Sequence, residues 1–133
     1  MIGSFIKSTC GATAVEFALI LPSILMFAFG TFEAGRAFYT YNSLQTAADE
    51  LTRYLFISYR EQDINRAQLV RDTETWLRNH YRYGDPSMIR VSGSVGQQDN
   101  IKFREIALSQ SITLTIPMVD VSFNVEAVRR LPY

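Results

Sequence analysis

The sequence predicts an α+β protein with a long N-terminal helix that begins in a membrane, a second helix, and a small antiparallel sheet of three to four strands. Sixteen residues without a charged side chain run from Phe17 to Phe32. After Arg36, apolar residues recur at three- and four-residue steps, which is the period of a helix face. From Met88 the period changes to two, which is typical of half-buried strands.

Composition limits the classes of function. The chain has 133 residues, 13 Lys and Arg against 13 Asp and Glu, one His and one Cys. A nucleic-acid-binding protein normally has a basic excess, a disulfide needs two cysteines, and a zinc site needs a cluster of ligands. We therefore expect one compact unit with no nucleic-acid partner, no metal and no cofactor.

The uncharged run is long enough to cross a bilayer. Counted from Gly11 to Phe32 it spans about 33 Å as a helix, against a hydrocarbon core of roughly 30 Å. We predict a transmembrane helix at 12–33 that contacts membrane lipid. Lys7 precedes it, so the positive-inside rule favours a cytoplasmic N-terminus and an exported domain at 34–133. A cleaved secretory signal ending at Ala28-Phe29-Gly30 is an alternative.

Glu16 stands in the first turns of this apolar helix, where an acid is costly and calls for an explanation. One explanation is that it lies among lipid headgroups and is solvated. The other depends on its neighbours. The stretch from Gly11 to Pro22 reads GATAVEFALILP. It resembles the processing site and N-terminal segment of TadE-like proteins, the pilin-like components of the tight-adherence (Tad, or Flp pilus) machinery, and the resemblance extends through Tyr39 to about residue 55.

This resemblance implies a function and a processing step. The chain would be a minor pilin or pseudopilin of a Tad/Flp pilus used in surface adherence. A prepilin peptidase would cut between Gly11 and Ala12 and remove the leader at 1–11, and Glu16 with Phe17 would serve subunit assembly. The implied location is the bacterial inner membrane, with the domain in the periplasm and then on the pilus or cell surface. The implied partners are the peptidase, related minor pilins, the major pilin and the inner-membrane assembly platform.

The chemistry of these residues supports the same pattern. Glycine at position 11 leaves the backbone accessible to a peptidase, and the cut would create an amine at Ala12, one helical turn from Glu16. In lipid both charges need partners, so the amine of one subunit can pair with Glu16 of another. Pro22 removes one helix hydrogen bond and predicts a kink, either as an ordinary membrane-helix feature or as part of filament packing.

The remaining elements follow from periodicity. We expect the first helix to continue to about Tyr59, with Asp49 and Arg53 able to pair, and a second helix at 63–82 capped by Asp63. Strands should follow around a turn at 97–100, with Pro117 between the last two. The predicted core between the first helix and the sheet comprises Leu51, Leu55, Ile112 and Leu114.

Catalysis is weakly supported, and we expect no enzyme. His80 is the only histidine and reads as a surface residue. The glycines at 93 and 96 fit strand and turn geometry better than a phosphate loop. Two other classes stay open: a single-pass membrane-anchored periplasmic binding module, and a periplasmic hydrolase built around His80.

Overall fold

The computed structural model describes residues 9–60, 62–116 and 119–132. They form an α+β fold, as the sequence predicts. In chain order the elements are α1 (Thr9–Ser58), α2 (Arg66–His80), the short 3-10 helix η1 (Pro86–Met88), β1 (Ile89–Gln98), β2 (Ile101–Ile116) and β3 (Val119–Pro132). Residues 1–8, which make up most of the predicted leader, lie outside the described residues, and so does Pro117.

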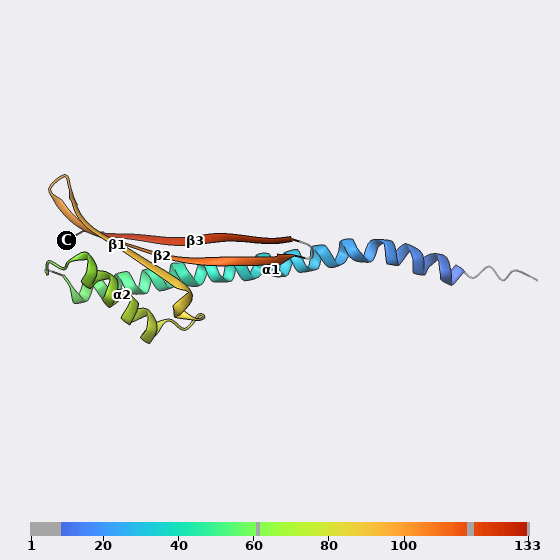
Figure 1. The fold of residues 1–133 in the computed structure, drawn as a ribbon, viewed down its shortest axis with the longest axis horizontal. Helices are drawn as coiled ribbons and strands as arrows, with labels where there is room; N and C mark the ends of the chain where they lie inside the picture. The colour runs from blue at the N-terminus through green and yellow to red at the C-terminus, as the bar shows by residue number, and fades with distance from the viewer. Residues whose placement is uncertain (1–8, 61, 117–118, 133) are drawn as a thin grey trace, which may run out of the picture.

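The helix α1 is a single element of 50 residues with Pro22 inside it. At 1.5 Å per residue it is about 75 Å long. Figure 1 shows that its C-terminal half lies along the sheet, whereas its N-terminal half extends well beyond it. The continuous helix predicted from the sequence is confirmed, and its end at Ser58 is one residue before the expected Tyr59.

The second helix is shorter than predicted, and its cap is different. Asn65 is the N-cap of α2, and its side chain accepts a hydrogen bond from the backbone N–H of Gln68. The predicted cap, Asp63, is wrong, because its carboxylate instead accepts from Lys102 Nζ at 2.8 and 2.9 Å. The helix ends at His80, two residues before the predicted end at 82.

The sheet has three antiparallel strands in the order β1-β2-β3. The predicted turn is confirmed: Asp99 and Asn100 connect β1 to β2 with φ angles of 51° and 68°. A two-residue hairpin turn of this kind needs positive φ at both positions, and Asp and Asn tolerate that conformation better than most residues. The sequence left open a fourth strand, but β2 runs unbroken over 16 residues.

Both helices cover the same face of the sheet, α1 under β2 and β3 and α2 under β1 (Figure 1). Apolar side chains from α1, α2, the three strands and the loop between the helices fill the space between the layers. The core consists of Leu44, Ala47, Ala48, Leu51, Leu55, Ile64, Leu69, Trp76, Leu77, Ile89, Ile106, Leu108, Ala127 and Leu131. Glycine at position 93 permits the close approach of α2, because a Cβ there would lie 3.3 Å from side-chain atoms of Leu69 and Val70.

The predicted core is right for three of its four members. Leu51 and Leu55 are buried in it, and Ile112 is buried nearby. Leu114 is only half-buried, because β1 pairs with β2 no further than Gln110 and the sheet is two strands wide beyond that point. Along β2 the inward position before Ile106 belongs to Arg104, which is 2% exposed.

Candidate functional site

The most apolar stretch of α1, in its N-terminal half, is not buried against any other described part of the chain. Its apolar side chains are exposed, up to 79% for Phe27. The helix is long and apolar enough to cross a membrane, and no residue of its most apolar stretch is buried. One hydroxyl within it is satisfied locally: Thr31 donates to the carbonyl of Phe27 at 2.8 Å. An apolar helix of this kind can anchor the protein in a membrane.

The predicted cleavage point lies near the beginning of this helix. Gly11 and Ala12 are helical and exposed, two and three residues after α1 begins at Thr9. The bond between them lies in an exposed part of α1 that is remote from the core of the domain. An enzyme that cuts here meets an exposed helix rather than a packed domain.

The two predicted assembly residues follow directly. Glu16 and Phe17 are both exposed on α1. Ala12 and Glu16 are four residues apart, so they lie on the same face of the helix. Within the described chain Glu16 makes no ion pair. The structure thus presents an unpaired acid in an apolar surface, together with the backbone from which the new amine would come.

Pro22 lies in the middle of the exposed half. It has no N–H to donate to the carbonyl of Ala18, so the hydrogen-bond ladder of α1 is interrupted there. Both residues are exposed. The interruption therefore lies within the apolar segment and away from the domain.

Where α1 leaves the apolar run, an ion pair and a hydrogen bond tie it to the sheet. Arg36 donates to Glu33 at 2.7 Å and also to the backbone carbonyl of Thr113 in β2. Both charged residues follow the uncharged run that ends at Phe32. Their link to β2 could not be found from the chain order, because Thr113 is 77 residues away.

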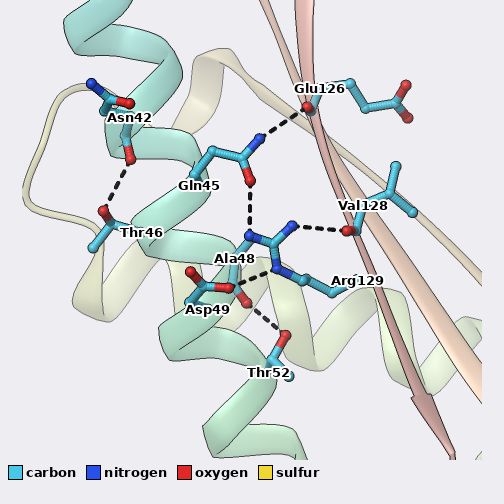
Figure 2. A network of polar contacts seen from close by, with 9 residues as sticks. All are labelled: Asn42, Gln45, Thr46, Ala48, Asp49, Thr52, Glu126, Val128 and Arg129. Carbon is cyan, nitrogen blue, oxygen red and sulfur yellow. Dashed lines mark hydrogen bonds and ion pairs between the residues drawn. The ribbon is translucent and has the colours of Figure 1, made fainter.

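A second polar cluster fixes α1 to β3 (Figure 2). Arg129 donates to Asp49 Oδ1 at 2.6 Å and to Gln45 Oε1 at 2.8 Å. Gln45 in turn donates to the carbonyl of Glu126 at 3.4 Å. The pairing of Asp49 with Arg53 that the sequence allowed is wrong, because the closer partner of Asp49 comes from the sheet.

A third link joins the end of α1 to α2. The hydroxyl of Tyr59 donates to the carboxylate of Asp72. This hydrogen bond, with a contribution from desolvation, raises the pKa of Tyr59 to about 12. Tyr59 therefore stays neutral under physiological conditions and acts as a structural donor.

His80 is the residue for which the sequence left a catalytic role open. His80 is exposed, as predicted; it stacks on Trp76 with ring centroids 5.1 Å apart, and its Nδ1 lies 3.1 Å from the carbonyl of Trp76. Among the described residues no group of three or more His, Cys, Asp and Glu side chains lies close enough to hold a metal ion.

The comparison with family models gives one match, to the family described as TadE-like protein, at residues 11–53. Searches of curated proteins and of solved structures give no significant match. The matched region begins at the predicted cleavage glycine, contains Glu16, Phe17 and Pro22, and ends in the packed half of α1. The stretch of chain that forms the exposed apolar helix and its junction with the domain is therefore TadE-like.

Proposed function

We propose that this protein is a minor pilin or pseudopilin that helps to assemble a Tad/Flp-type pilus used in surface adherence. The observation that carries the proposal is the coincidence of the TadE-like match with a helix whose apolar half has no partner in its own chain. Such a surface needs lipid before assembly and other subunits afterwards. A pilin is surrounded by lipid before assembly and by other subunits after it.

Before assembly the protein is held in the bacterial inner membrane by a single pass at 12–33, with its N-terminus in the cytoplasm and residues 34–133 in the periplasm. Its role is structural rather than catalytic. Its partners are a prepilin peptidase, related minor pilins, the major pilin and the inner-membrane assembly platform. The matched helix and its apolar length support this arrangement.

Assembly begins with cleavage after Gly11, which exposes the amine of Ala12. In a low-dielectric surrounding that ammonium is attracted to a carboxylate, and Glu16 of a neighbouring subunit supplies one. The pair is formed between chains because Glu16 has no ion-pair partner within the described part of its own chain. Phe17 and the other exposed apolar residues then pack between helices.

Processing is tested by intact-mass measurement and N-terminal sequencing of protein from native membranes. We expect the parent protein to begin at Ala12. Gly11→Leu should retain all eleven leader residues and be about 1.2 kDa heavier, from the masses of these residues. The bulky side chain obstructs entry of the backbone to the peptidase.

Gly30→Leu is the matched control, because a Cβ at Gly30 meets nothing within 4 Å. It should be processed normally. A start at Thr31 in the parent, abolished by Gly30→Leu, would show a secretory signal instead. Normal cleavage of Gly11→Leu would contradict the assigned site.

A further inference from the structure

The β2–β3 hairpin extends beyond the third strand of the sheet. Pairing with β1 ends at Gln110, but β2 and β3 stay paired as far as Ile116 and Val119. We call residues 111–116 and 119–125 the hairpin arm. Figure 1 shows it lying along α1 on the side of the domain that faces the apolar half of the helix.

Polar contacts fix the position of the arm along the axis of α1, which we call its level. Arg129 and Glu126 of β3 contact Asp49 and Gln45 of α1, so β3 runs in the same direction as the helix and begins nearer to its N-terminus. From Glu126 back to Val119 a strand covers about 23 Å, which equals about fifteen residues of helix. Val119 therefore lies near the level of residue 30, within the apolar run.

The link from Arg36 gives the same level independently. Arg36 donates to the carbonyl of Thr113. From Thr113 to the end of β2 at Ile116 the strand advances about 10 Å, or roughly six to seven helix residues. This again places the end of the arm beside residues 29–30. Figure 1 agrees, because β3 begins beside the light-blue part of α1.

The face of the arm that turns toward α1 is apolar and becomes more exposed toward the membrane end. Ile112 is 4% exposed, Leu114 is half-buried, and Val119 is 55% exposed. Between the arm and the helix lies an open groove of about 430 Å³, lined by Ala34, Ala37, Phe38, Tyr41, Leu114, Phe123 and Val125. The groove begins two residues after the apolar run ends at Phe32.

The opposite face and the edges of the arm are polar. Thr113 pairs with Ser122 there, with the hydroxyl oxygens 3.0 Å apart, and Thr115 pairs with Asp120. β3 is an edge strand, and the β2 segment past Gln110 has no β1 residue opposite it. Open strand edges and a carboxylate are not stable in hydrocarbon, but headgroups and water can bind them.

We propose that the hairpin arm rests in the headgroup layer of the bilayer that anchors α1, with its apolar face and the groove in contact with lipid of the leaflet on the domain's side. This inference rests on the proposed membrane anchor. The headgroup layer is roughly 5–8 Å thick on each side, so it covers the end of the arm when the hydrocarbon boundary lies near residue 30. The arm thereby fixes the tilt and height of the exported domain before assembly.

The depth of the arm can be measured with fluorescent labels. The full chain carrying Cys10→Ser, and hence no native cysteine, is given one cysteine at a time and reconstituted in phosphatidylcholine–phosphatidylglycerol vesicles. Nitroxide quenchers are placed either on the lipid headgroup or deep in the acyl chain. Val119→Cys and Val121→Cys report on the arm, and Phe27→Cys reports on the anchor.

Ile101→Cys is the matched control, because Ile101 begins β2, the strand paired with β3, at the far end of the sheet and is 57% exposed, against 55% for Val119. We expect the headgroup quencher to reduce emission at Val119 and Val121 but not at Ile101. The acyl-chain quencher should reduce emission at Phe27 alone. Retention of a cooperative thermal transition shows that each labelled chain is folded.

The other outcomes overturn the inference in distinguishable ways. If Phe27 is quenched and Val119 behaves like Ile101, the anchor stands and the arm lies in water. If Val119 is quenched as deeply as Phe27, the arm lies in hydrocarbon and the headgroup assignment is wrong. If Phe27 itself is not quenched, α1 does not anchor the protein in the bilayer, and the proposed contact of the arm with lipid is wrong as well.

Discussion

Leu25 and Leu51 lie on the same uninterrupted helix, yet Leu25 is 45% exposed and Leu51 is 1% exposed. The N-terminal half of α1 is apolar on all sides, and the C-terminal half has an apolar stripe that faces the sheet. An amphipathic stripe indicates a partner within the same chain, whereas an apolar surface all round indicates lipid or other chains. The two halves therefore differ in where their partners come from.

The acids on the two halves show the same difference. Asp49 receives a hydrogen-bonded ion pair from Arg129 of the same chain. Glu16 has no ion pair within the described chain, although it stands in a surface where an isolated charge costs more. The contrast supports an assembly role for Glu16, and it can be tested by removing each kind of interaction in turn.

The largest effect is expected from Glu16→Ala. The uncharged residue is easier to insert in lipid, so membrane level and cleavage after Gly11 should stay normal. The variant should lose co-purification with other pilins and should produce few or no surface pili, because the partner of the Ala12 amine is missing. Immunoblotting of membranes and counting of surface pili by electron microscopy measure the two effects.

Glu50→Ala is the matched control, since Glu50 is an exposed acid on the packed half of the same helix. It should assemble normally. Glu16→Gln should be nearly as defective as Glu16→Ala, because it keeps size but not charge. Full piliation by correctly processed Glu16→Ala would show that the proposed ion pair is not needed for assembly. It would favour either the headgroup explanation or a membrane-anchored binding module.

Leu51→Ala should have the next largest effect, on stability. Truncating a buried leucine costs about 2–5 kcal/mol, against a total unfolding free energy of about 5 kcal/mol for so small a domain. The full chain in detergent micelles should lose its cooperative melting transition. Leu25→Ala makes the same chemical change where no neighbour packs within the chain, and it should leave the melting temperature unchanged. Equal effects would show that the two halves are not distinct.

The sequence predicts much of this fold because its strongest signals are local. The apolar run, the helical period after it, and the alternation of the strands each depend on neighbours along the chain. The turn at Asp99 and Asn100 follows from residue type alone. In the apolar half of α1, Glu16 and Gly11 likewise stand out by residue type from a largely uniform background.

What the sequence does not predict depends on contacts between distant segments. Arg104 occupies a core position because its guanidinium reaches the carbonyl of Gln62, which no local pattern indicates. Leu114 has the period of a core residue but lies past the end of β1. Asp49 has an allowed partner four residues away in Arg53, yet the register of β3 brings Arg129 closer. For the proposed cleavage and assembly residues, whose proposed partners are other molecules, the single chain gives only their position.

A moderate effect is expected from breaking the α1–β3 cluster. Arg129→Met should cost about 1 kcal/mol, because the side chain is partly exposed and solvent weakens its ion pair with Asp49. Denaturant unfolding of the full chain in micelles measures it. Arg53→Met removes the partner that helix spacing suggested, and it should be nearly neutral. A larger loss from Arg53→Met would favour the local pair over the one in the structure.

The smallest effect concerns the link between the end of α1 and α2. The folded chain raises the pKa of Tyr59 from 10.0 to about 12 through its hydrogen bond to Asp72. As pH rises, the unfolded phenol loses its proton first, so the stability from this bond is complete below pH 10 and is lost as pH rises toward 12. Since Tyr59 is partly exposed, we expect the loss to be below about 1 kcal/mol.

The free energy of unfolding, measured between pH 10 and 12, should depend less on pH in Tyr59→Phe than in the parent. Asp72→Asn should reduce the pH dependence in the same way. Identical pH profiles for all three chains would show that Tyr59 ionises as it does in the unfolded chain.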